Sequence, residues 1–264
     1  MKKTINDLSV FTLGSSDSRA IIFVHGFPYD HNMWEAQIQE LGKDYFCASY
    51  DIRGLGDSPA GDGQFTMESF VDDLEIILDE QKLNKPILCG LSMGGYISLR
   101  ALERLPERFS AAILCDTRSE ADNNEGKLKR AAGIKRINKE GLAPLVKDFI
   151  TNCFGDDFKQ NKKGELQKII EGSSRFNPVG VKGSLLAMLS RLDTTTSLGK
   201  INIPTLLICG EQDTLTPPPV MKDMFHKINK AEFVEIPNAG HMTPIENPHL
   251  VNKAIRDFLI KNNL

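Results

Sequence analysis

A serine flanked by glycines is the first feature of this sequence that points to chemistry. Ser92 lies in the segment Gly90–Gly94, a G-x-S-x-G pattern between an apolar run at 86–89 and a helical stretch at 96–102. A strand, a tight turn and a helix in this order would strain the serine backbone, and side chains at the two glycines would collide across the turn. The hydroxyl would project at a helix N-terminus, which favours developing negative charge. Ser92 is therefore our candidate nucleophile.

A serine hydroxyl needs a base to take its proton, and the sequence offers five histidines. His241 follows the apolar run at 233–236 and precedes the last helical stretch, so its loop should lie at the carboxyl end of a late strand. His226 and His249 fall in helical patterns typical of surface positions, and His31 has no evident orienting partner. We take His241 as the candidate base.

The histidine in turn needs a carboxylate that fixes its tautomer and stabilises its cation. Asp213 follows the apolar run at 205–209 directly, within Gly210–Pro217. The resulting chain order is serine, aspartate, histidine. Asp116, after an earlier apolar run, and Glu211 are the competitors for this role.

Acyl transfer also places negative charge on a carbonyl oxygen, which needs donors aimed at it. One donor should be the backbone N–H of Met93, next to the nucleophile. The other should come from the loop His25–Pro28, where the N–H of Phe27 is the candidate, because Pro28 has none. The loop Asp51–Ser58 contains two glycines, but no G-x-G-x-x-G pattern or P-loop occurs, so we interpret it as structural.

The elements that would position these residues alternate along the chain. Short apolar runs without polar alternation are typical of strands covered on both faces, as in a parallel sheet; they lie at 20–24, 45–50, 86–89, 111–115 and 205–209. The segment 7–14 is weaker and indicates an early, antiparallel edge strand. Thr66 is placed to cap a helix from Met67, and Asn247 to cap one that begins at Pro248. This rhythm predicts a doubly covered α/β sheet.

The alternation of strand and helix patterns stops in the middle of the chain. Residues 117–199 are rich in Lys, Glu, Asn and Gly and contain helical fragments, such as 128–137 and 142–149, but no buried-strand run. We therefore predict a core of residues 1–116 and 200–264 and a helical cap of residues 117–199. Apolar cap side chains would line a pocket for a small or medium apolar substrate, not a charged one; the candidates are Leu142, Phe149, Phe154, Phe176, Leu185 and Met188.

Composition excludes several other classes. A formal net charge of −3 argues against nucleic-acid binding. No apolar run of membrane-spanning length occurs, and the N-terminus lacks the apolar segment of a secretory signal. The five cysteines are odd in number and form no CxxC pair, which favours buried free thiols in a reducing cytoplasm over disulfides or zinc. The sequence does not indicate the oligomeric state.

Taken together, these motifs resemble the α/β-hydrolase superfamily. The resemblance rests on HGFP at 25–28, DIRGLGDS at 51–58, GLSMGG at 90–95, GEQDTLTP at 210–217 and NAGHM at 238–242. It implies a mostly parallel eight-stranded sheet with helices on both faces and a helical cap after the sixth strand. It also implies a catalytic triad of Ser92, Asp213 and His241, with Phe27 and Met93 as the oxyanion hole.

Within that superfamily the chain is similar to small bacterial carboxylesterases, arylesterases, cofactor-free haloperoxidases and 3-oxoadipate enol-lactonases. The resemblance implies cleavage of small to medium carboxylic esters through an acyl-enzyme, with no metal or organic cofactor. Lactone hydrolysis and perhydrolysis use the same triad and stay open, as does a ligand receptor or signalling protein on the same fold. Ser92 at the nucleophile position disfavours epoxide hydrolases and haloalkane dehalogenases, which carry aspartate there.

Overall fold

The computed structural model describes residues 1–264 and contains one eight-stranded sheet. The strand order is β1-β2-β4-β3-β5-β6-β7-β8, and every neighbouring pair from β4 to β8 is parallel. The strands are β1 Lys2–Ile5, β2 Leu8–Leu13, β3 Ala20–Val24, β4 Phe46–Tyr50, β5 Ile87–Leu91, β6 Ala111–Cys115, β7 Thr205–Gly210 and β8 Ala231–Ile236. The predicted mostly parallel eight-stranded sheet is confirmed.

The N-terminal edge of the sheet differs from the prediction. The segment at 7–14 forms β2, which is antiparallel to β4 as expected, but β2 is not the edge strand. That place belongs to β1, which pairs with β2 as a hairpin. Three of its four residues are exposed, so no apolar pattern marks the strand, and its main-chain pairing with β2 holds it in place.

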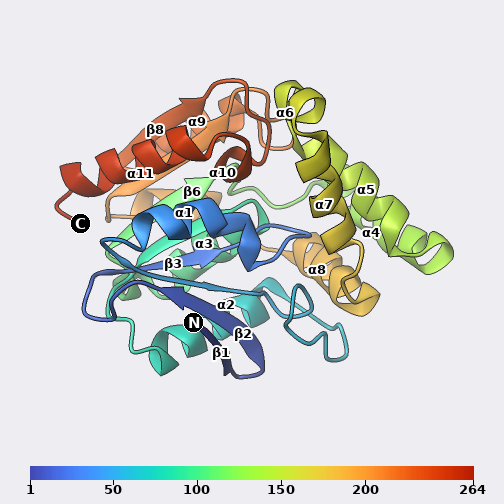
Figure 1. Cartoon of the computed structure of the whole chain (residues 1–264), viewed down its shortest axis with the longest axis horizontal. Helices are drawn as coiled ribbons and strands as arrows, with labels where there is room; N and C mark the ends of the chain where they lie inside the picture. The colour runs from blue at the N-terminus through green and yellow to red at the C-terminus, as the bar shows by residue number, and fades with distance from the viewer.

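Helices cover both faces of the sheet. The core helices are α1 Glu35–Leu41, α2 Met67–Glu80, α3 Met93–Arg104, α9 Pro218–Lys227, α10 Thr243–Glu246 and α11 Pro248–Lys261, with short 3₁₀ turns at His31–Trp34 and Pro106–Arg108. Along the sheet, the connection from β3 to β4 through α1 runs in the opposite direction to the connections through α2, α3 and α9. Because all of these crossovers are right-handed, α1 lies on one face of the sheet and α2, α3 and α9 lie on the other. The terminal helix α11 packs against α1 and completes that layer (Figure 1).

Two helix starts follow the capping rules. The Thr66 hydroxyl accepts a hydrogen bond from the Ser69 N–H at 3.1 Å at the start of α2. The Asn247 side chain accepts from the Leu250 N–H at 3.2 Å, and Pro248 occupies the first turn of α11. Both predicted caps are confirmed, because each satisfies an N–H that the helix itself cannot.

Between β6 and β7 the chain forms only helices. They are α4 Asn124–Glu140, α5 Leu142–Cys153, α6 Asp156–Asn161, α7 Lys163–Ser173 and α8 Pro178–Ser190, followed by a 3₁₀ segment at Thr195–Lys200. Figure 1 shows α4–α8 gathered at one end of the sheet. We call residues 117–199 the cap; its status as a domain distinct from the core stays a prediction.

One carboxylate joins the two ends of the cap. Asp122, just before α4, forms ion pairs with Arg130 at 3.1 Å and with Arg191, just after α8, at 2.9 Å. The guanidinium of Arg191 also lies over the ring of Tyr96 in α3, 4.1 Å from its centroid. The two ends of the cap are therefore fixed to each other and to the core.

The sheet forms the centre of a continuous hydrophobic core. Every residue of β3, β5, β6 and β7 is buried, as predicted for strands covered on both faces. The five cysteines are free and buried, and burial raises the pKa of the Cys47 thiol to about 12. No helix combines the length and the apolar character needed to cross a membrane.

Candidate active site

The serine turn has the geometry that its glycines predict. Ser92 joins β5 to α3 with φ 54° and ψ −114°, a strained conformation for a non-glycine residue. Its N–H donates to the Cys115 carbonyl at 3.0 Å, and its own carbonyl accepts from the Thr117 hydroxyl at 2.9 Å. A Cβ on Gly94 would lie 2.1 Å from the Val24 carbonyl oxygen, so only glycine lets α3 begin this close to β3.

The histidine and the aspartate predicted from the sequence meet this serine. His241 Nε2 lies 2.8 Å from Ser92 Oγ, and His241 Nδ1 lies 2.8 Å from Asp213 Oδ2. The three residues follow β5, β7 and β8, so their loops share the carboxyl edge of the parallel sheet. All three are buried, with Ser92 the most accessible at 9% exposure.

Asp213 is held as an anion. Burial alone would raise its pKa, but His241 and hydrogen bonds from Thr216 outweigh burial and lower the pKa of Asp213 to about 2. Its Oδ1 accepts from the backbone N–H of Leu215 at 2.8 Å, and its Oδ2 accepts from the Thr216 hydroxyl at 2.6 Å. An ionised Asp213 accepts from Nδ1–H of His241, which leaves the Nε2 lone pair to accept from the Ser92 hydroxyl.

The two competing carboxylates make other hydrogen bonds, although that of Asp116 lies within 4.8 Å of Asp213. Asp116 Oδ1 accepts from the Gly210 N–H at 2.9 Å, and its Oδ2 contacts the Thr243 hydroxyl at 2.5 Å. Burial raises the pKa of Asp116 well above its usual range, and the nearby Asp213 adds to the rise. Glu211 accepts from the Asn238 N–H at 2.9 Å. Neither carboxylate is hydrogen-bonded to His241, so the structure places Asp213 alone beside the imidazole.

Two backbone N–H groups are available beside the serine. Met93 is the first residue of α3, so its N–H has no acceptor within the helix. The N–H of Phe27 donates to no main-chain or side-chain acceptor of the protein. A Cβ on Gly26 would lie 3.4 Å from Ser92 Cβ, so the loop carrying Phe27 packs directly against the serine turn. Phe27 and Met93 therefore both lie beside Ser92, and their role as oxyanion donors stays a prediction.

A cavity of about 330 Å³ opens onto Ser92 and His241. Of the six apolar cap residues proposed as its lining, Phe149, Leu185 and Met188 line it. The other three do not: Leu142, Phe154 and Phe176 pack into the hydrophobic core of the protein. The expectation of an apolar lining is therefore correct for half of the proposed residues.

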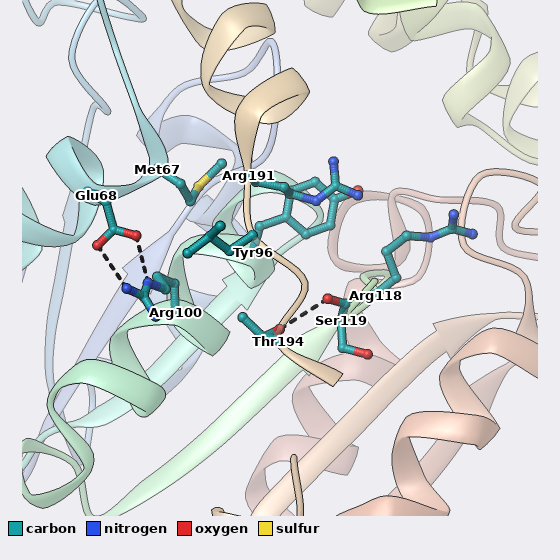
Figure 2. A pocket seen from close by; sticks show the side chains of 9 residues that line it. Met67, Glu68, Tyr96, Arg100, Arg118, Ser119, Arg191 and Thr194 are labelled. Carbon is teal, nitrogen blue, oxygen red and sulfur yellow. Dashed lines mark hydrogen bonds and ion pairs between the residues drawn. The ribbon is translucent and has the colours of Figure 1, made fainter. Parts of the chain in front are cut away.

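Charged side chains also line this cavity, and none of them was predicted from the sequence. They are Arg118, Asp122, Lys129 and Arg130. Arg118 and Tyr96 additionally border a small crevice beside the cavity (Figure 2). Arg118 was discoverable, because it follows the apolar run at 111–115 by three residues and so comes from the same sheet edge as Ser92.

Glu246 is a second residue that the sequence did not reveal. Its Oε1 accepts from the N–H groups of Gly240 at 2.9 Å and Met242 at 3.0 Å, which flank His241. Its Oε2 accepts from the N–H of Gly155 in the cap at 2.7 Å. The N–H of His241 itself donates to the Cys153 carbonyl at 2.7 Å. The histidine loop is thus fixed from both the core and the cap.

Comparison with known proteins agrees with this architecture. A family model described as "alpha/beta hydrolase fold" matches residues 19–248. 3-Oxoadipate enol-lactonase 2 of Acinetobacter baylyi is 27% identical over 97% of this chain and 94% of its own length. 3-Oxoadipate enol-lactonase 1 of the same organism is 30% identical over 91% and 88%, respectively.

Among solved structures, a thermophilic esterase from Thermogutta terrifontis with malate bound is 33% identical, with a TM-score of 0.93 over 100% of this chain and 99% of that one. The chain belongs to the α/β-hydrolase fold family. The fold and these relatives together support a hydrolase activity.

Proposed function

We propose that this protein hydrolyses carboxylic esters through an acyl-enzyme, with Ser92 as nucleophile, His241 as general base and Asp213 as the residue that orients the histidine. One observation carries the proposal: Ser92 Oγ lies 2.8 Å from His241 Nε2 at the wall of a 330 Å³ cavity. That distance allows direct proton transfer as the hydroxyl attacks. A hydrogen-bonded nucleophile and base, with the base oriented by a third group, is the arrangement that activates a serine.

The acylation step follows from this arrangement. The Ser92 oxygen forms a bond to the substrate carbonyl carbon while His241 takes the hydroxyl proton. The buried, ionised Asp213 stabilises the imidazolium that results. The negative charge on the former carbonyl oxygen is stabilised by the N–H groups of Phe27 and Met93 and by the N-terminus of α3. His241 then protonates the departing alkoxide, the ester bond breaks, and the acyl group remains on Ser92.

Deacylation repeats these roles with water. His241 accepts a proton from a water molecule that attacks the acyl carbon, and the same N–H groups bind the oxyanion. Collapse of this second intermediate releases the acid, and His241 returns the proton to Ser92. Every proton in this cycle moves through His241, and no step requires a metal or organic cofactor.

The second candidate reaction is lactone hydrolysis. It is favoured by the two Acinetobacter relatives, which are enol-lactonases, whereas the solved relative from Thermogutta is an esterase. In a lactone the leaving alcohol stays attached to the acyl chain, so both reactions need the same residues. A chain-length series of p-nitrophenyl esters measured beside a panel of lactones separates the two by kcat/KM.

The nucleophile assignment has a direct test. Ser92→Ala should lower ester turnover by about 10⁴-fold or more, because removal of the nucleophile leaves only binding and oxyanion stabilisation. A fluorophosphonate probe should add one equivalent of mass to the wild type and none to this variant. Ser16→Ala, at an exposed position, is the matched control and should behave as the wild type. Near-normal turnover by Ser92→Ala would refute the proposal.

A further inference from the structure

The cavity beside Ser92 contains one cation without an anionic partner. Arg130 is paired with Asp122 at 3.1 Å, and Lys129 is paired with Glu125 at 2.8 Å. Arg118 makes no ion pair; its one hydrogen bond to the protein runs from Nη2 to the Leu215 carbonyl oxygen at 3.3 Å. A neighbouring arginine, Arg100, is by contrast paired with Glu68 at 2.7 Å (Figure 2).

The Arg118 side chain as a whole is half-buried, but one of its donor atoms is buried without a partner, which is costly. The Nε atom of Arg118 is shielded from solvent and donates no hydrogen bond. A guanidinium stays charged at any physiological pH, so it cannot escape this cost by losing a proton. Buried donors and charges in native proteins are normally paired, so an unpaired donor at a cavity wall is a position where a ligand can complete the pairing.

The position of Arg118 is fixed relative to the serine. Its neighbour Thr117 is fully buried and donates its hydroxyl hydrogen bond to the Ser92 carbonyl at 2.9 Å. Ser119 on the other side is buried too, and its hydroxyl lies 2.9 Å from that of Thr195. The backbone that carries Arg118 is therefore held on both sides, against the nucleophile turn and against the end of the cap.

We propose that Arg118 binds a free carboxylate on the substrate, so the substrate is a short ester or lactone that carries a second, ionised carboxyl group. This inference rests on the proposed function, since it names the substrate class of the same site. The planar guanidinium matches a carboxylate through two parallel hydrogen bonds. The carbon chain between the carboxylate and the reacting carbonyl would lie along Phe149, Leu185 and Met188, which line the same cavity.

The other charges of the cavity do not oppose this assignment. Asp122 is an anion at the cavity wall, but each of its oxygens is paired, one with Arg130 and the other with Arg191. Lys129 and its partner Glu125 are largely exposed. Arg118 is thus the cation that the cavity leaves open to an anionic ligand. The assignment differs from the expectation of an uncharged substrate, which rests on the apolar cap residues alone.

Two matched substrates test the inference. The neutral one is p-nitrophenyl butyrate, and the charged one is the mono-p-nitrophenyl ester of glutaric acid, which adds a terminal carboxylate. The wild type should prefer the charged ester in kcat/KM. Arg118→Gln should lower the ratio of charged to neutral kcat/KM by about 10- to 100-fold, as expected for loss of a charge-assisted hydrogen-bonded pair. Arg118→Lys should retain part of the preference, because lysine keeps the positive charge but cannot make the two parallel hydrogen bonds of a guanidinium.

The control is Lys129→Gln, which removes the same charge from the same cavity at an ion-paired, exposed position. It should leave the substrate ratio within twofold of the wild type. A measurement on the unmodified protein adds a check that does not depend on folding of the variants. Glutarate should inhibit hydrolysis of the neutral ester competitively, at a concentration at least tenfold below that needed for butyrate.

The outcomes separate the two proposals. Ser92-dependent hydrolysis of the neutral ester, with no preference for the charged one and equal inhibition by glutarate and butyrate, overturns the role of Arg118 and leaves the esterase proposal standing. Failure of the wild type to cleave any ester or lactone overturns the proposed function and this inference with it. A ratio that falls equally in Arg118→Gln and Lys129→Gln also overturns the inference, because it indicates a general effect of charge.

Discussion

Replacement of Glu246 by alanine should reduce both the stability of the protein and its turnover. The carboxylate accepts three backbone N–H groups: those of Gly240 and Met242 on either side of His241, and that of Gly155 at the start of α6. Alanine removes all three acceptors at once. The N–H groups are left in a partly buried site. The loop that carries His241 keeps the bond from its own N–H to the Cys153 carbonyl but loses the acceptor on either side of the histidine.

The magnitude follows from the number of bonds. A hydrogen bond to a charged group contributes about 1.5 kcal/mol or more, so three such bonds set a loss of about 4.5 kcal/mol if water replaces none of them. Water entering the space vacated by the side chain reduces this loss to about 3 kcal/mol. For a chain of this size that corresponds to a decrease in Tm of about 6 to 12 °C. Turnover should fall about 100-fold, because a displacement of the imidazole by about 1 Å has that effect.

Glu246→Gln separates the two attachments. Its amide oxygen can still accept from the N–H groups of Gly240 and Met242, but its NH₂ group would then face the Gly155 N–H, and two donors cannot pair. This variant should keep most of its turnover while its Tm falls by a few degrees. Thermal unfolding and p-nitrophenyl ester assays, both in mildly alkaline buffer so that the carboxyl is ionised, measure the two effects.

The control is Glu235→Ala, which removes an exposed carboxylate paired with Lys222 on the surface. It should change stability by less than about 1 kcal/mol. A Glu246→Ala variant with the Tm and the turnover of the wild type would show that the three N–H groups do not depend on this carboxylate, and the reasoning would be wrong.

Two further predictions concern the sheet edge. Burial raises the pKa of Asp116 in the folded state. The stability of the wild type therefore falls as the pH rises from the unfolded pKa of about 3.9 toward the folded pKa. Asp116→Asn has no carboxyl group to titrate, so its Tm relative to that of the wild type should increase between about pH 5 and pH 8 in thermal melts. A constant difference over that range would contradict the raised pKa. Gly94→Ala should lower the free energy of unfolding by about 3 kcal/mol or more, because its Cβ would meet the Val24 and His25 carbonyl oxygens at 2.1 and 2.7 Å. The control Gly164→Ala, with nothing within 4 Å of its Cβ, should raise the free energy of unfolding by up to about 1 kcal/mol. Equal denaturation midpoints for the two variants would rule out this steric argument.

Much of the sheet could be predicted because its strands are buried on both faces. The apolar runs at 20–24 and 111–115 coincide with β3 and β6, since only continuous apolar sequence can be covered on both sides. The first strand was missed for the opposite reason. Lys2, Lys3 and Thr4 are exposed, and their strand conformation depends on main-chain pairing with β2, which leaves no pattern in the side chains.

The positions of the three candidate catalytic residues could also be predicted, because each follows a recognisable strand and parallel strands end at one edge. The cavity lining could not. Whether a helical side chain such as Phe149 or Leu142 faces the cavity depends on how α5 packs over the core, and both belong to the same apolar pattern. Arg118 escaped notice because a single polar residue between a strand and an insertion resembles an ordinary loop residue.

The shared ion pairs of Asp122 set the boundaries for exchanging the cap between related proteins. A graft cut before residue 122 and after residue 191 transfers both partners together. To receive Arg191, the recipient must supply an aromatic ring at the place of Tyr96 and a main-chain carbonyl at the place of Glu120. A junction placed between these positions separates the carboxylate from a guanidinium that is 3% exposed, which costs about 3 to 5 kcal/mol. Chimaeras with the first kind of junction should therefore fold far more often than those with the second.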